Sequence, residues 1–347
     1  MRKLLIVGGS TVHTGNFCHL VSKGFDEILL ITDGDHATLE DIPRKHAGFS
    51  LRNPLRIGKN IKRIRSLVES FRPDIIHVQQ AGTEAWLVLR AVHGLKIPVI
   101  VTAWGSDVLV SPGRGIFYRR MLNYILGHAD ALTCDSYHVA AKMQEFAGNQ
   151  SLDITLANFG INIERMGLPK EKLIYSNRLH KPLYNLDLIL KAFKSSLDRG
   201  YFSGWKLVMA GEGEETGSLK SLAKELGIEE LVDFPGWLNR ETNSAFYEKA
   251  SIFVSIPSSD ATAISLLEAM ASGCIPVLSN LPANHEWVID GYNGIIATDL
   301  HSNFLEKSLM MDPQKTAAIN KEIIEDKGTR DANRRKFIDL YERILSR

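Results

Sequence analysis

One loop and the helix after it contain the residues whose types and spacing could do chemistry. A short apolar run ends at Pro257, a polar loop with Asp260 follows, and a helix is predicted from near Thr262 to Gly273. The free N–H groups at such a helix start suit phosphate oxygens. Asp260 and Glu268 could accept hydrogen bonds from hydroxyls of a sugar or ribose. A simpler interpretation, equally open, has Asp260 as the helix cap and Glu268 as a solvated helix residue.

The elements that would position this loop are short apolar runs separated by segments of helical periodicity. Runs that are apolar on both faces and alternate with helices predict parallel strands buried under helices. They fall into two groups, which predicts an α/β chain of two doubly wound, Rossmann-like domains. A (β/α)₈ barrel fits poorly, because the runs outnumber its strands. The runs cover residues 3–8, 27–32, 75–79, 98–104, 131–135 and 154–158, then 172–177, 206–211, 231–235, 251–256, 275–279 and 293–297.

Turn residues between the two groups predict a hinge in residues 158–169. We therefore expect an N-terminal domain over residues 1–165 and a C-terminal domain over residues 166–327. Residues 328–347 contain a final amphipathic helix, which we expect to cross back to the first domain. In open α/β sheets, ligands bind outside the carboxyl ends of the strands, so site residues are expected in the loops that follow strands.

The helix segment and several other blocks resemble a known family. With Gly236 before it and residues 273–277 after it, this segment is similar to the signature of retaining GT-B glycosyltransferases of family 4 (glycosyl transferases group 1). The resemblance implies two Rossmann-like domains that face each other across a cleft, with residues 1–165 as the acceptor domain and residues 166–327 as the nucleotide-sugar-binding domain. It also implies transfer of a sugar from a nucleotide sugar to a glycan or lipid-linked glycan, in polysaccharide or glycoconjugate synthesis. Further blocks in the family order are residues 172–180, 206–214, 231–237 and 282–294.

The resemblance implies roles for residues of the second domain. Glu268 matches the family carboxylate that holds the ribose of the nucleotide. Asp260 stands, one methylene shorter, where the family has a Glu that contacts the transferred sugar. Amides at the helix start would hold the donor phosphate. The donor-binding residues expected in this domain are Gly236, Trp237, Thr262, Ala263, Ile264, Ser265 and Glu268.

Two cations are expected beside the phosphate. Family members place an Arg and a Lys in the loop after the first strand of the second domain, where they neutralise the departing nucleotide. Arg178 matches the Arg, whereas Tyr184 falls close to the Lys position, and Lys181 is the expected substitute. A single cation with helix amides could still stabilise a leaving phosphate. In that case a monophosphate-linked donor such as a CMP-sugar stays open beside a diphosphate donor.

Two loops of the first domain are expected to contribute. Gly9 and Ser10 follow the first strand, where glycine lets the backbone approach a ligand, although a tight turn explains the same residues. Trp104 stands where many family members carry a His that contacts the donor sugar. It could stack on a sugar face while Asp107 accepts hydrogen bonds from hydroxyls, and a buried Trp with a capping Asp is the alternative. The predicted catalytic residues are Arg178, Lys181, Asp260 and Asp107.

The segment of residues 52–72 is strongly basic and amphipathic. These cations could hold an anionic membrane surface or a polyprenyl-linked acceptor. The alternative is an ordinary helix, packed by its apolar stripe, with a solvated basic face. The cations are Arg52, Arg56, Lys59, Lys62, Arg63, Arg65 and Arg72, with Arg114, Arg119 and Arg120 as a second group, and the only acid among residues 52–72 is Glu69.

Net charge, cysteine spacing and the length of the apolar runs exclude several other classes of protein. With 41 Lys and Arg against 40 Asp and Glu, the net charge of +1 argues against a dedicated nucleic-acid binder. The three widely spaced cysteines fit a reducing compartment rather than a disulfide or zinc framework. No apolar run is long enough to span a membrane, and the first is too short for a signal peptide. We therefore expect a cytoplasmic protein, which lies at the inner membrane face if it contacts lipid.

No cofactor or metal is expected. The motif Asp33-Gly34-Asp35 has the form of a metal motif but also of a common turn, and the spacing of residues 211–217 is wrong for a dinucleotide fingerprint. The leading hypothesis is a metal-independent, retaining, hexosyltransferase-like enzyme whose partners are a nucleotide sugar and a glycan or polyprenyl-linked acceptor. The alternatives are a nucleotide-sugar epimerase of the same fold and a non-catalytic nucleotide-sugar binding protein.

Overall fold

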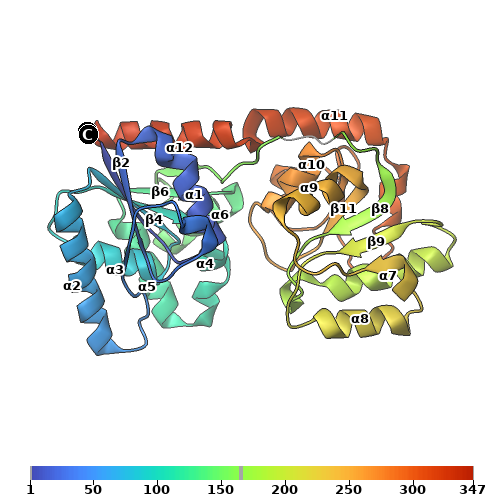
Figure 1. Ribbon diagram of the computed structural model, residues 1–347, viewed down its shortest axis with the longest axis horizontal. Coiled ribbons are helices and arrows are strands. Elements are labelled where there is room, and N and C mark those ends of the chain that lie inside the picture. Colours follow the sequence, from blue (N-terminus) through green and yellow to red (C-terminus); the bar gives the residue numbers. More distant parts are fainter. Residues whose placement is uncertain (1, 164–166, 347) are drawn as a thin grey trace. The chain divides into compact units, whose positions relative to one another are not determined.

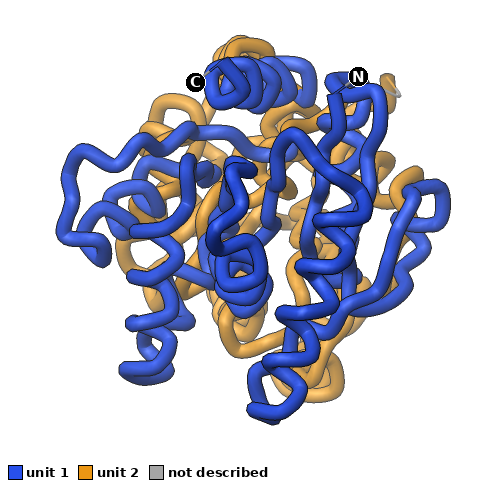
Figure 2. The backbone as a smooth tube through the Cα atoms, turned by 90° about the vertical axis from the view of Figure 1, so that its left-hand side faces the viewer, with its two compact units in different colours: residues 1–159, 330–347 blue, residues 160–329 orange. Residues whose placement is uncertain are grey.

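The computed structural model of the chain describes residues 2–163 and 167–346 and divides into two compact units. Unit 1 contains residues 1–159 and 330–347, and unit 2 contains residues 160–329 (Figures 1 and 2). The boundary falls inside the expected hinge, whose residues 164–166 lie outside the described residues. Each unit has its own parallel sheet and its own helices.

Unit 1 is built on a parallel sheet with the strand order β3-β2-β1-β4-β5-β6-β7. Leu5 in β1, the third strand of this order, lies opposite Leu29 of β2 on one side and Ile76 of β4 on the other. The order reverses direction at β1, as in doubly wound sheets. The strands are β1 (Lys3–Val7), β2 (Glu27–Thr32), β3 (Arg44–His46), β4 (Ile75–Gln79), β5 (Val99–Ala103), β6 (Ala131–Cys134) and β7 (Ile154–Leu156).

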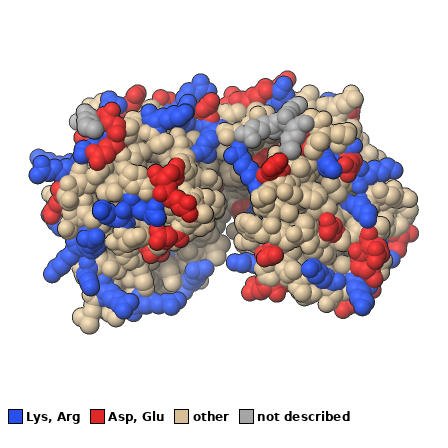
Figure 3. Space-filling model, viewed as in Figure 1, with Lys and Arg blue, Asp and Glu red and all other residues tan. Residues whose placement is uncertain are grey.

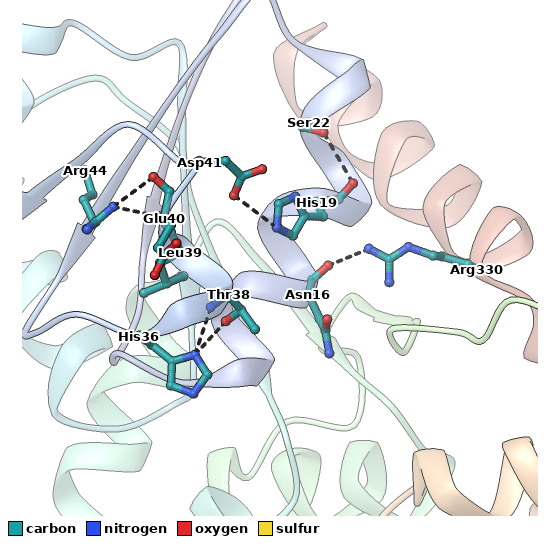
Figure 4. Close-up of polar contacts among 10 residues, drawn as sticks. All are labelled: Asn16, His19, Ser22, His36, Thr38, Leu39, Glu40, Asp41, Arg44 and Arg330. Atoms are coloured by element: carbon teal, nitrogen blue, oxygen red, sulfur yellow. Dashed lines mark hydrogen bonds and ion pairs between the residues drawn. The ribbon is translucent and has the colours of Figure 1, made fainter. Parts of the chain in front are cut away.

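The edge strand β3 was not predicted, because its sequence Arg-Lys-His carries no apolar signal. Polar contacts hold it in place. The guanidinium of Arg44 lies 2.8 Å from the Asp35 carboxylate. It also donates a 2.7 Å hydrogen bond to the carbonyl of Leu39, which Figure 4 shows. A short basic edge strand of this kind also resists pairing with another sheet.

Helices cover both faces of the unit 1 sheet. Figure 1 shows α1 and α12 on one face and α2, α3 and α5 on the other. None of the helices in the described part of the chain is long and apolar enough to cross a membrane. The helices are α1 (Val12–Val21), α2 (Pro54–Phe71), α3 (Thr83–Ala91), α4 (Ser106–Leu109), α5 (Ile116–His128), α6 (Tyr137–Ala147) and α12 (Arg330–Leu345).

The last helix, α12, is part of the core of unit 1 although it is distant in sequence. Phe337 is fully buried and packs edge-to-face on Phe17 of α1, with ring centroids 5.1 Å apart. The Tyr341 hydroxyl lies 2.7 Å from Nδ1 of His77 in β4. At the start of the helix, Arg330 donates a 2.8 Å hydrogen bond to the carbonyl of Asn16 (Figure 4). Unit 1 therefore needs this helix to complete its core.

Unit 2 repeats the plan with a parallel sheet of order β10-β9-β8-β11-β12-β13. In Figure 1, α7 and α8 cover one face of this sheet and α9, α10 and α11 the other. The strands are β8 (Glu171–Ser176), β9 (Lys206–Met209), β10 (Val232–Asp233), β11 (Ala250–Ser255), β12 (Ile275–Ser279) and β13 (Ile295–Ala297). The helices are α7 (Leu186–Asp198), α8 (Thr216–Glu225), α9 (Arg240–Lys249), α10 (Ile264–Ala271) and α11 (Pro313–Ile323). The two doubly wound sheets confirm the predicted fold class.

Replacing Phe337 by Ala tests whether α12 is part of the core. The variant leaves a cavity between α1 and α12, so we expect it to lower the free energy of unfolding by about 3–5 kcal/mol. Asp339→Ala, on the exposed side of the same helix, should change it by less than about 0.5 kcal/mol. Urea unfolding followed by circular dichroism measures both. Equal, small effects would show that α12 contributes little to unit 1.

Candidate functional site

Two loops of unit 2 meet at the carboxyl edge of its sheet. The strands β8 and β11 are neighbours, with Tyr175 opposite Phe253, so the loops that follow them begin side by side. The backbone N–H of Ser258 in the second loop donates to the carbonyl of Leu183 in the first, at 2.8 Å. The Asn185 side chain donates to the carbonyl of Ile256, also at 2.8 Å. These bonds fix the two loops against each other.

Arg178 lies at the centre of these loops, where four side chains come together. Its Nη2 is 2.6 Å from Asp260 Oδ2, and its Nη1 donates a 2.9 Å hydrogen bond to Ser265 Oγ. The guanidinium also lies 4.5 Å from the ring centroid of Tyr184. The side chains of Arg178 and Asp260 are only 12% and 25% exposed. The structure thus brings together three of the predicted residues, whereas Lys181 is exposed and outside this group.

The helix α10 starts directly behind this group. It begins at Ile264, two residues later than predicted, because Thr262 and Ala263 still belong to the loop. Its N-cap, Ala263, has no side-chain oxygen with which to cap the first amides. Asp260 does not cap the helix, since its carboxylate accepts from Arg178 and from the amide of Ala261 at 3.0 Å. The amide end of α10 therefore keeps its affinity for an anion.

Glu268 lies on the same helix, one turn beyond Ser265, and is partly buried. Burial raises the pKa of its carboxyl group, while a hydrogen bond from the Tyr247 hydroxyl and the positive charge of Arg240 act in the opposite direction. The same hydroxyl accepts a 2.8 Å hydrogen bond from the side chain of Asn177, the residue before Arg178. Sequence reasoning missed Asn177 and Tyr247, because neither belongs to a recognisable motif.

Glycines allow a neighbouring loop to pack closely behind Arg178. Gly211 has a φ of +108°, and a Cβ there would lie 2.7 Å from the carbonyl oxygen of Arg178. At Gly213 a Cβ would lie 2.3 Å from the carbonyl oxygen of His180. Residues 211–217 therefore support the backbone of Arg178. Gly236, with a φ of +76°, lies beside Glu212, and Trp237 after it is exposed.

The predicted site residues of unit 1 mainly make contacts with other residues of unit 1. The amide of Ser10, after Gly9, donates to Asp33 Oδ1 at 2.9 Å, as in a tight turn. The indole of Trp104 stacks on Phe159 with ring centroids 4.0 Å apart, which occupies one of its faces. Asp107 is 4% exposed and accepts from the amides of Ala81 and Trp104 at 2.8 and 3.2 Å. Its carboxylate is therefore engaged by backbone amides of two loops of unit 1.

Fold and site together define a class. Two doubly wound parallel sheets, the second with an arginine and a helix amide end at its carboxyl edge, are the plan of the GT-B fold. Residues 161–310 match the family model "Glycosyl transferases group 1", and residues 7–165 match "Glycosyltransferase Family 4". The chain is therefore a glycosyltransferase of the GT-B type.

Relatives and solved structures agree with this class. An uncharacterised glycosyltransferase of Methanocaldococcus jannaschii is 24% identical over 322 residues, which cover 88% of this chain and 84% of that protein. The alpha-monoglucosyldiacylglycerol synthase of Streptococcus pneumoniae is 25% identical over 62% of this chain and 53% of its own length. The crystal structure of Anabaena HepE in complex with UDP shares the fold, with a TM-score of 0.82 at 16% identity over 99% of this chain and 100% of that chain.

The role of Gly211 can be tested by adding one methyl group. In Gly211→Ala the positive φ and the contact with the Arg178 carbonyl should lower the free energy of unfolding by about 1–3 kcal/mol. Gly217→Ala, a change of the same size at a position of α8 with no neighbour within 4 Å, should raise it by about 0.5–1 kcal/mol. Urea titrations measure both. Equal effects would show that Gly211 does not support the arginine loop.

The buried charge of Glu268 should be a cost to the fold. Because burial raises its pKa, the folded chain holds this proton to higher pH than the unfolded chain, and stability from this group falls as pH rises through that window. Glu268→Gln should therefore unfold at neutral pH with a free energy no lower than wild type, and the difference should vanish below about pH 4. Thermal unfolding across pH measures this. A clear loss of stability at neutral pH would show that the charge stabilises the fold and would contradict the expected cost.

Proposed function

We propose that the chain moves a sugar, with retention of configuration, from a nucleotide-sugar donor to a glycan or lipid-linked glycan acceptor. This proposal rests on the position of the Arg178 guanidinium, which Asp260 and Ser265 hold at the amide end of α10. A fixed cation and free helix amides form a preorganised site for a phosphate that gains charge as it departs.

In the proposed reaction the bond between the anomeric carbon and the donor phosphate breaks as the acceptor oxygen bonds to that carbon. The acceptor attacks from the face that the nucleotide leaves, so configuration is retained. The departing phosphate oxygen takes the proton of the acceptor hydroxyl, which balances the step. Arg178 and the amides of α10 stabilise the negative charge on the leaving phosphate, so no metal ion is assigned to this task.

Other side chains of unit 2 would bind the rest of the donor. Glu268 is proposed to accept hydrogen bonds from the ribose, and the network through Tyr247 holds its carboxylate in place. Asp260 is proposed to exchange Arg178 for hydroxyls of the transferred sugar when the phosphate arrives. Trp237 is exposed next to Gly236 and is proposed as a contact for the nucleotide. Lys181 is the proposed second cation, because Tyr184 falls close to the position where the family has its Lys.

The names of similar proteins support the class of substrates. The lipopolysaccharide core biosynthesis glycosyltransferase LpsE of Rhizobium meliloti is 33% identical over 94 residues, which cover 27% of this chain. The relative from Streptococcus pneumoniae is named for a lipid product. Anabaena HepE has been crystallised with UDP-glucose. We therefore propose glycan or lipid-linked acceptors in the cytoplasm, and a uridine diphosphate sugar as the first donor to test.

Arg178→Ala should lower kcat by about 100- to 1000-fold, with a smaller loss of donor affinity, because its contact strengthens as the phosphate gains charge. Arg178→Lys, which keeps the charge but loses the two-pronged guanidinium, should fall in between. Arg199→Ala removes an arginine of the same unit that pairs with Glu306 and should retain activity. Initial rates with UDP-, GDP-, ADP-, TDP- and CMP-sugars measure the effect. The rates are compared at equal concentrations of folded wild type and folded variant. Full activity of Arg178→Ala would remove its assigned role.

The products of the same assay separate the proposed function from its rivals. NMR of the glycoside should show the anomeric configuration of the donor, and an inverted product would refute retention. Incubation with donor alone should leave the nucleotide sugar unchanged apart from slow hydrolysis. An epimerised nucleotide sugar would establish an epimerase instead. Donor-dependent thermal stabilisation without turnover across a broad acceptor panel would indicate a binding protein.

A further inference from the structure

Unit 1 exposes large apolar side chains at the first turns of two helices. Leu55, in the first turn of α2, is 87% exposed. Ile116 and Phe117, the first two residues of α5, are 65% and 55% exposed. The contacts that these helices make with the core come from other residues, such as Ile64 and Val68 of α2 and Ile125 of α5. The exposed side chains are therefore not needed for packing.

The sheet topology places these two helix starts at the same edge of unit 1. α2 and α5 both pack against α3, on the same face of the sheet. Each of them leads back to the start of the next parallel strand, β4 for α2 and β6 for α5. Their first turns therefore lie at the carboxyl edge, on either side of α3. We call residues 52–59 and 114–120 the helix-tip surface.

The helix-tip surface is rich in cations and has no acid. No Asp or Glu occurs in residues 42–68 or 108–129. In the described part of the chain, no acidic side chain pairs with the exposed cations, unlike Arg65, which binds Glu69 and the carbonyl of Ala91. Figure 3 shows Lys and Arg along the lower edge of unit 1, where α2 and α5 lie in Figure 1. The exposed cations are Arg52, Arg56, Lys59, Arg114, Arg119 and Arg120.

We propose that the helix-tip surface docks unit 1 on an anionic lipid bilayer. Leu55, Ile116 and Phe117 would enter the boundary between headgroups and acyl chains, and the surrounding cations would bind lipid phosphates. Basic residues alone would also suit a nucleic acid. Exposed aliphatic and aromatic side chains among them favour a bilayer, and the net charge of +1 does not favour nucleic acid. This docking is independent of the transfer chemistry proposed above.

Vesicle flotation of the full chain tests the electrostatic part. We expect binding to vesicles of phosphatidylcholine with 30% phosphatidylglycerol, and little binding to phosphatidylcholine alone. Each basic residue near an anionic bilayer contributes ~1 kcal/mol of binding free energy. Arg119→Gln/Arg120→Gln, which removes two of them, should therefore lower the partition coefficient roughly 30-fold. Lys220→Gln/Lys224→Gln makes the same charge change on exposed positions of α8 in unit 2 and should bind like wild type. Equal loss in both double variants would refute a localised surface.

Apolar substitutions separate a bilayer from a polyanion. Ile116→Ser/Phe117→Ser should lower the partition coefficient at least about tenfold, because two apolar side chains no longer leave water. Leu309→Ser/Met310→Ser is the matched control, since both residues are exposed on the short helix η7 (Glu306–Met310) of unit 2. The same variants are tested with poly(U) RNA. The proposal would be overturned if RNA binding were tight and needed Arg119 and Arg120 while vesicle binding did not depend on Ile116 and Phe117. It would also be overturned if the chain showed no preference for anionic vesicles.

Discussion

The ion pair between Arg178 and Asp260 is the interaction on which the candidate site depends. The charge on an arginine side chain that is only 12% exposed is costly to leave without a partner, and Asp260 and Ser265 together provide that partner. Tyr184 covers a face of the same group. The cation is therefore already positioned for the phosphate that we propose to bind at the start of α10 in exchange for Asp260. The pairing of β8 with β11 and the close packing of Gly211 on the Arg178 carbonyl both hold the loop of Arg178 in place.

The sequence predicted what depends on local pattern. Apolar runs predicted the strands of both sheets except β3, whose basic residues are held by polar contacts with Asp35 and Leu39 rather than by burial. The first residue of α10 was placed two residues early, because a sequence of small residues does not show where the loop becomes helical. Arg178, Asp260 and Ser265 were all named from the sequence, and the structure shows that Arg178 contacts the other two.

Tertiary contacts decided what the sequence left open. Asp107 could equally have faced a ligand, and only the amides of Ala81 and Trp104 show that its carboxylate holds the backbone. Tyr247 supports Glu268 from another helix, with no sequence motif that links the two. The basic segment of residues 52–72 also divides in three dimensions. Arg65 holds the neighbouring helix, whereas the cations at the start of α2 remain available for a partner outside the chain.

A crystal structure of the chain with UDP bound tests the central claim most directly. The account predicts that oxygens of the diphosphate lie within hydrogen-bond distance of the Arg178 guanidinium and of the first amides of α10, with the ribose at Glu268. A nucleotide bound elsewhere, with the pair between Arg178 and Asp260 closed and packed protein at the start of α10, would contradict it.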